Sequence, residues 1–185
     1  GIRSGTIDMM PLPQTATMIE AACAYVRKGW RLCLLRPQSK VPALHAWNDP
    51  MRVLDSEDRV RAALMSSPGA GIGLVHATSR TATVDIDHVE YARMAFAELG
   101  IDYDAMFAGA PRIRSRKGRD KIVLRLPDGF APGEGGVPTK YVLRWPLPHG
   151  GTVTVMELRG GVNQDVLPPS IHPDTGEPYA WHDGQ

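Results

Sequence analysis

The sequence predicts an α+β fold in which helices flank a mainly antiparallel sheet, and three observations support that class. Glycine and proline are plentiful, at 19 and 16 of 185 residues, which indicates many turns. Aromatic residues are few, at 6%, and short β-branched runs recur between helical stretches, which disfavours a helical bundle. The 43% hydrophobic content is enough for the core of one compact domain.

Residues 1–14 lack hydrophobic periodicity, and we expect them to form a mobile tail ahead of one domain, residues 15–185. The domain opens with a helix for which Thr17 is the predicted N-cap, with Glu20 at the capping-box position. Gly29 is expected to end this helix, because glycine adopts the left-handed backbone of a helix terminus without strain.

The later elements are bounded by similar signals. Ser56 is expected to cap a second helix, and Gly100 to end a third. Loops are expected over residues 37–50 and over the Gly/Pro-rich residues 127–138. The predicted helices are 17–28, 56–65 and 89–99, and the predicted strands, all in one sheet, are 30–35, 72–75, 81–86, 111–114, 121–126, 140–144, 153–158 and 165–167.

Two carboxylates stand at strand spacing in Asp85-Ile86-Asp87. Residues i and i+2 of a strand point to the same face, where two carboxylates repel each other unless a cation lies between them. Mg²⁺ and Mn²⁺ prefer oxygen ligands, so the pair is a candidate metal site. The alternative is that Asp87 caps the helix that begins at Val89.

A third carboxylate, Glu157, interrupts an apolar strand just before Gly160. If this strand lies beside the first, three acids would hold two cations. That arrangement can activate a 3′-hydroxyl and stabilise a leaving pyrophosphate. The alternative is a salt bridge between Glu157 and Arg159, two residues further along the same face.

Basic residues gather between Arg112 and Lys121, where six of them stand with one acid, Asp120. The segment carries +5 and the remainder of the chain −4, for a total of +1. A Gly turn among Ser, Lys and Arg offers N–H groups and cations to a triphosphate, whereas the alternative is a solvated basic strand edge. The candidate nucleotide-binding residues here are Ser115, Arg116, Lys117, Gly118, Arg119 and Lys121, with Lys40 and Arg159 as additional candidates.

Near the end of the sequence, Pro168-Pro169 and Pro173 make a stiff loop that presents Ser170 and His172. His172 is therefore a candidate for contact with a phosphate or a base. The alternative, which we favour for a lone histidine, is a structural turn in which the ring caps neighbouring groups.

Cys23 and Cys33 lie in apolar stretches without a CxxC or Cys/His cluster, which predicts buried thiols in a reducing compartment. No apolar run has transmembrane length and no signal peptide is visible, so we expect a cytoplasmic protein without membrane contact.

Taken in order, these segments resemble the N-terminal domain of bifunctional DNA primase/polymerases, in the archaeo-eukaryotic primase superfamily, which occurs in plasmid, phage and integrated replication proteins. The resemblance covers roughly residues 17–182. The matching segments are Ala21-Ala22, Tyr25-Val26, Gly29-Trp30, Lys40-Val41-Pro42, Trp47, Gly71-Ile72-Gly73-Leu74-Val75, Asp85-Ile86-Asp87, Glu157-Leu158-Arg159-Gly160, Leu167-Pro168-Pro169-Ser170-Ile171-His172-Pro173, Tyr179 and Trp181.

The resemblance implies an RRM-like catalytic sheet, in which Asp85, Asp87 and Glu157 are both catalytic residues and ligands of two Mg²⁺ or Mn²⁺ ions. It implies template-directed transfer of nucleotides from nucleoside triphosphates onto single-stranded or primed DNA, with pyrophosphate as product. Family proteins commonly add a helical priming domain and a helicase, so a helicase domain or protein is an expected partner in the full-length context.

The chain departs from the family at one motif. Family members often carry a Ser-Gly-Gly-x-His motif for nucleotide binding, but here Lys121 stands where the histidine usually lies and Gly118-Arg119 replaces the glycine pair. Lysine holds phosphate charge but lacks imidazole chemistry. A non-catalytic module that binds nucleotide or single-stranded DNA, and a metal-dependent nuclease, therefore stay open as alternatives.

Overall fold

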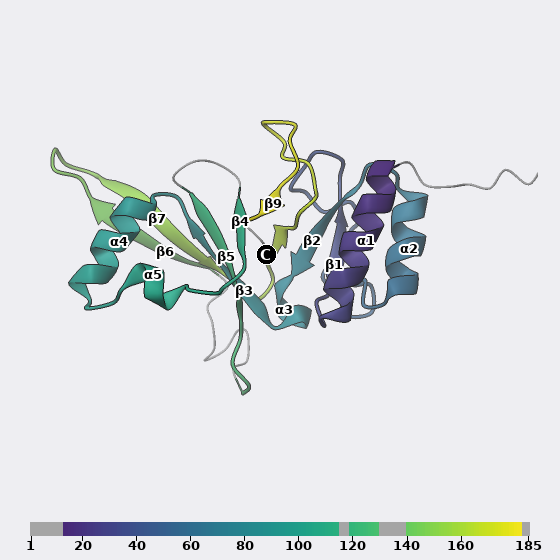
Figure 1. Cartoon of the computed structure of the whole chain (residues 1–185), viewed down its shortest axis with the longest axis horizontal. Helices are drawn as coiled ribbons and strands as arrows, with labels where there is room; N and C mark the ends of the chain where they lie inside the picture. Colours follow the sequence, from purple (N-terminus) through teal and green to yellow (C-terminus); the bar gives the residue numbers. More distant parts are fainter. Residues whose placement is uncertain (1–12, 115–118, 130–139, 183–185) are drawn as a thin grey trace, which may run out of the picture.

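The computed structural model describes residues 13–114, 119–129 and 140–182 (Figure 1). The helices are α1 (Pro13–Arg27), α2 (Glu57–Ser66), α3 (His76–Ser79), α4 (Val89–Glu98) and α5 (Tyr103–Met106). The strands are β1 (Leu32–Leu35), β2 (Gly71–Val75), β3 (Thr81–Ile86), β4 (Arg112–Arg114), β5 (Asp120–Arg125), β6 (Lys140–Pro146), β7 (Thr152–Arg159), β8 (Gln164–Val166) and β9 (Ala180–Trp181).

The α+β class is confirmed, but the prediction of one sheet is wrong. Three strands form one sheet in the order β1-β2-β8, and six form another in the order β6-β7-β3-β5-β4-β9. Every strand pairing between described residues is antiparallel. The chain leaves β7 through a turn at Gly161, where φ is 56°, and β8 then pairs with β2. The local sequence pattern predicts a strand at β8, but it does not predict that this strand pairs with β2.

Helix α1 begins earlier than predicted. It starts at Pro13, and Thr17 lies inside it, where its hydroxyl donates to the Pro13 carbonyl oxygen at 3.0 Å. Proline suits the first helical position, because its φ is already helical and no N–H is lost there. The Thr17 cap was therefore wrong. The predicted tail otherwise lies outside the described residues, at 1–12.

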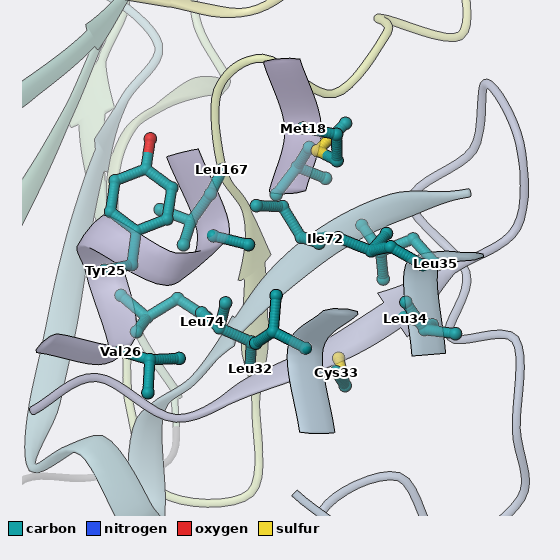
Figure 2. Close-up of a cluster of buried hydrophobic side chains, with 14 of the residues drawn as sticks. Met18, Tyr25, Val26, Leu32, Cys33, Leu34, Leu35, Ile72, Leu74 and Leu167 are labelled. Atoms are coloured by element: carbon teal, nitrogen blue, oxygen red, sulfur yellow. The ribbon is translucent and has the colours of Figure 1, made fainter. Parts of the chain in front are cut away.

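The three-stranded sheet and helices α1 and α2 share one core. Figure 2 shows side chains from α1, β1 and β2 converging with Leu167 in this core. Strands β1 and β2 are buried at every position, so they read as continuous apolar runs and not as alternating ones. Cys23 and Cys33 are both buried free thiols, as expected.

The six-stranded sheet has two different faces. Helices α4 and α5 cover one of them, through a core of Val84, Ile86, Ile122, Phe96 and Tyr103 with neighbours. Residues of the other face include Ile113 and Val123, which belong to the core of the three-stranded sheet. Figure 1 shows the two helical layers at opposite ends of the molecule, with the remaining sheet face directed inward between them.

Other predicted boundaries agree with the structure to within one or two residues. Ser56 is the N-cap of α2, and its hydroxyl accepts from the Arg59 N–H at 3.2 Å. Strand β3 has the predicted bounds. The short elements α3, α5 and β9 were not predicted. No helix among the described residues is long and apolar enough to cross a membrane.

Candidate functional site

Asp85 occupies the centre of the inward face of the six-stranded sheet. Its register partner on β5 is Lys121, and its partner on β7 is Glu157. Directly opposite residues of antiparallel strands project to the same face, so two acids and one lysine stand in a row across three strands. The expectation that the Glu157 strand lies beside the Asp85 strand is therefore confirmed.

Asp87 lies just beyond the end of β3, and its backbone N–H donates to the Val155 carbonyl oxygen at 2.8 Å. The N-cap of α4 is His88, and no side-chain hydrogen bond caps that helix. The alternative in which Asp87 caps the helix is therefore wrong. Its charge bears on Asp85 instead, as part of the electrostatics of that carboxyl.

The pKa of Asp85 is raised, first because the carboxyl is largely buried. Lys121 opposes that shift, while the carboxylates of Asp87 and Asp165 reinforce it. The ionised form of Asp85 is therefore costly in this surrounding and gains from any additional positive charge. That is the electrostatic condition in which a carboxylate binds a cation or a proton more readily than usual.

Glu157 does not stand free beside Asp85. Its Oε1 accepts from Arg159 Nη1 at 2.9 Å, and its Oε2 lies 3.6 Å from Lys140 Nζ. The alternative that Glu157 forms a salt bridge with Arg159 is thus confirmed. Across the described ranges, no group of three or more His, Cys, Asp or Glu side chains is arranged to hold a metal ion.

Arg159 makes two hydrogen bonds and one longer ion pair around the same site. Besides Glu157, its Nη2 donates to the Gln164 carbonyl oxygen at 3.3 Å and its Nε lies 3.4 Å from Asp165 Oδ1. Lys121 Nζ lies 3.2 Å from the same Asp165 oxygen, and the lysine side chain is only 12% exposed. Burial lowers the pKa of Lys121, but Asp165 and Asp85 outweigh burial and raise it, so the amine is charged.

The basic segment is divided by the fold. Arg112 Nη1 lies 3.3 Å from Asp120 Oδ2, which also accepts from the Tyr103 hydroxyl at 2.9 Å. Arg114 and Arg119 are exposed. The candidates Ser115, Arg116, Lys117 and Gly118 lie outside the described residues. Because β4 lies between β5 and β9, and β5 between β3 and β4, the alternative of a basic strand edge is wrong.

His172 and Ser170 fasten their loop. His172 is buried, and its Nδ1 accepts from the N–H groups of Asp174 at 3.0 Å and Thr175 at 3.4 Å. The Ser170 hydroxyl, also buried, accepts from the Ile72 N–H on β2 at 2.9 Å. This geometry favours the structural turn for His172, and its contact with a nucleotide stays a prediction.

Lys40 is exposed in the loop after β1. Its carbonyl oxygen accepts from Gln164 Nε2 at 2.9 Å, and Gln164 immediately precedes Asp165. The backbone of Lys40 is therefore tied to the strand that carries Asp165. The role of the Lys40 ammonium in nucleotide binding stays a prediction.

Sequence reasoning missed two residues of this site, His76 and Asp165. Asp165 Oδ2 accepts from His76 Nε2 at 2.7 Å and from the Thr83 hydroxyl, and the Thr81 hydroxyl lies 2.9 Å from His76 Nδ1. All four residues are buried. One signal was available: Asp165 directly precedes the apolar residues Val166 and Leu167 and lies within a predicted strand, where an acid is unusual.

Comparison with known protein families gives a match over most of the chain. The family model for the N-terminal domain of bifunctional DNA primase/polymerases, Prim-Pol, matches residues 22–185. No match was found among curated proteins. The matched range includes both sheets and every site residue described above, and it leaves out only the first part of α1 among the named elements. The chain therefore belongs to the Prim-Pol family of bifunctional DNA primase/polymerase N-terminal domains.

Proposed function

We propose that this chain is the catalytic domain of a phage- or plasmid-type replication protein that transfers nucleotides onto DNA, directed by a template, with release of pyrophosphate. Membership of the Prim-Pol family supports primase/polymerase activity in general. The observation that carries the specific site is the register of β3, which sets Asp85 between Lys121 and Glu157 on one face.

The fit of this face to divalent metal is partial. Asp85 and Asp87 interact electrostatically, and Asp85 is a half-buried carboxylate that added positive charge would stabilise, which suits Mg²⁺ or Mn²⁺. Glu157 joins such a site only by exchanging its ion pairs with Arg159 and Lys140. We therefore propose Asp85 and Asp87 as the primary ligands and Glu157 as the third.

When bound, the metal ions supply positive charge that activates the primer hydroxyl and stabilises the leaving pyrophosphate. The protein residues have separate tasks. Asp85 and Asp87 hold that charge at a fixed point of the sheet, and Lys121 offers a buried, charged amine to the phosphates from the neighbouring strand. Exposed Arg114 and Arg119 extend the positive charge outward from β4 and β5 for the triphosphate or the template.

The test is primer extension with Asp85→Asn and Asp87→Asn, each assayed on a labelled primer–template with Mg²⁺ and separately with Mn²⁺. We expect each substitution to lower the rate of incorporation by about 100-fold or more, because it removes a charged ligand without changing side-chain size. Asp104→Asn is the matched control, since Asp104 is an exposed carboxylate paired with Arg93 at 2.9 Å.

If both variants incorporate nucleotide at the rate of purified wild type assayed in parallel, this face of the sheet is not the catalytic site. Shortening of the labelled strand in place of extension would instead assign a nuclease.

A second candidate, a non-catalytic module that binds nucleotide or single-stranded DNA, is favoured by two observations. Glu157 is held by two cations, and no cluster of three potential ligands occurs among the described residues. Binding of fluorescent single-stranded DNA that persists in Asp85→Asn and weakens steeply with salt, together with no extension by wild type, is the expected result for that module.

The full-length context is part of the proposal. We propose that a helicase domain or protein acts with this domain, as is common in the family, and that the chain by itself extends a primer more readily than it starts one. Assays with primed and unprimed single-stranded templates separate these two activities.

A further inference from the structure

Asp165 is a carboxylate buried between the two sheets. It belongs to β8 of the three-stranded sheet, where it pairs with Leu74, but its side chain meets residues of the other sheet. Its Oδ2 accepts from His76 and from Thr83, and its Oδ1 faces Lys121 at 3.2 Å and Arg159 at 3.4 Å. Both oxygens are therefore fully used.

This carboxylate is ionised although its side chain is only 5% exposed. Burial alone would raise its pKa. The charge of Lys121, the hydrogen bond from His76 and the charge of Arg159 outweigh burial and hold the pKa of Asp165 below its usual value. The buried charge of Asp165 is tolerated because oppositely charged and hydrogen-bonding groups surround it. Removing one of these partners is expected to lower the stability of the folded protein strongly.

The partners of Asp165 surround Asp85. Thr83 is two residues before Asp85 on β3, Lys121 is opposite Asp85 on β5, and Arg159 is opposite Thr83 on β7. All of these positions lie on the inward face of the six-stranded sheet. Asp165 thus reaches from the three-stranded sheet onto the same patch of the sheet that carries Asp85.

Lys121 has two carboxylates within electrostatic reach, Asp165 and Asp85, and the ion pair is made with Asp165. A lysine ammonium is a point charge on a flexible four-carbon stem, so its position is decided by its partners. Without the Asp165 charge, Asp85 becomes the carboxylate that attracts Lys121. The ammonium would then neutralise Asp85, a proposed metal ligand, and would leave the position from which we propose that it contacts the triphosphate.

We propose that Asp165 is a positioning residue of the nucleotide site. It draws Lys121 away from Asp85, so that the ammonium is held for the triphosphate and the Asp85 carboxylate stays available to a cation. His76 and Thr83 fix the Asp165 oxygen that faces away from Lys121, and Arg159 shares the other oxygen. This inference rests on the proposed nucleotidyl-transfer function and adds a residue that does not itself touch the substrate.

The first experiment is a double-mutant cycle of Asp165→Asn, Lys121→Gln and the two together. Binding of the fluorescent nucleotide mant-dATP is measured with Mg²⁺ and without template, alongside the KM and kcat for dNTP in primer extension. We expect each single substitution to weaken nucleotide binding about tenfold, mainly as a rise in KM, and the double variant to lose no more than the weaker-binding single.

The matched control is Tyr103→Phe. It removes a hydrogen bond to Asp120 on the helix-covered face of the same sheet, away from Lys121, and so lowers stability without touching the proposed network. A merely structural role for Asp165 predicts that nucleotide affinity follows thermal stability across all variants, and that the losses of the two single substitutions multiply in the double variant. Either result overturns the proposal, as does wild-type affinity in Asp165→Asn.

A second measurement separates this proposal from the proposed function. Crystal structures of wild type and Asp165→Asn locate Lys121 Nζ without any nucleotide. We expect it to leave residue 165 and approach Asp85 in the variant, and an unmoved Nζ overturns the inference. If wild type neither binds nor incorporates nucleotide, the proposed function fails, while the Nζ positions still show whether Asp165 holds Lys121.

Discussion

Glu157 and Asp165 are both acids that lie within strands, and they illustrate what residue patterns can and cannot predict. The sequence suggested a metal ligand or a salt bridge for Glu157, and the structure has the salt bridge to Arg159 at 2.9 Å. That partner is two residues away on the same strand face, so it was predictable. Of the partners of Asp165, Lys121 lies 44 residues away in sequence and His76 lies 89 residues away, and no local pattern identifies them.

Tyr25 gives a prediction of pH-dependent stability at the residue scale. Its hydroxyl donates to the Pro168 carbonyl oxygen at 2.6 Å and accepts from Trp181 Nε1 at 2.8 Å. Burial raises the pKa of Tyr25 to about 12. A phenol with a raised pKa in the folded state contributes stability that is complete below pH 10 and is lost as the pH rises through 12.

We therefore expect the free energy of unfolding of wild type to fall by roughly 2–3 kcal/mol more than that of Tyr25→Phe between pH 10 and pH 12. Urea titrations at several alkaline pH values measure the difference. Parallel curves for the two proteins would show that the hydroxyl does not resist ionisation in this way.

At the scale of helices and strands, an element was predicted correctly where contacts between residues close in sequence determine it, and incorrectly where distant contacts do. Strand β3 was predicted with its correct bounds, because β-branched residues and a following turn determine it locally. Strand β8 was predicted as a strand but assigned to the wrong sheet, because its pairing with β2 joins residues about 90 positions apart. The start of α1 was missed because residues 13 and 14 were assigned to the tail, whereas Pro13 is the first helical residue.

The loop after β8 is predicted to depend on Ser170. Its buried hydroxyl accepts from the Ile72 N–H and donates to the Ile72 carbonyl oxygen at 3.3 Å, which fastens the loop to β2. Ser170→Ala leaves the Ile72 N–H without this acceptor and should lower the free energy of unfolding by about 1–3 kcal/mol.

Thr175→Ala is the control in the same loop, because the Thr175 hydroxyl accepts from the Glu177 N–H in an exposed turn. Its effect should stay within about 0.5 kcal/mol. Denaturant unfolding compares the two variants, and an equal, small loss in both would mean that Ser170 does not hold the loop.

At the scale of the whole molecule, the site depends on the contact between two sheets. Ile113 and Val123 of the six-stranded sheet share a core with the three-stranded sheet, and Tyr25 of α1 bonds to Trp181 of β9. Asp165 crosses the same boundary to reach Lys121. The resemblance predicted membership of the Prim-Pol family, which the family match over residues 22–185 confirms, while the catalytic role of Asp85, Asp87 and Glu157 stays a prediction. The division into two sheets, and the polar contacts between them, required the structure.

A crystal soaked with Mn²⁺ and a non-hydrolysable dNTP shows whether the face around Asp85 is the site of nucleotidyl transfer. We expect an anomalous Mn²⁺ signal in contact with the Asp85 and Asp87 carboxylates, with the triphosphate extending toward Lys121. Mn²⁺ bound elsewhere, or a triphosphate bound away from this face of the sheet, would rule out this site.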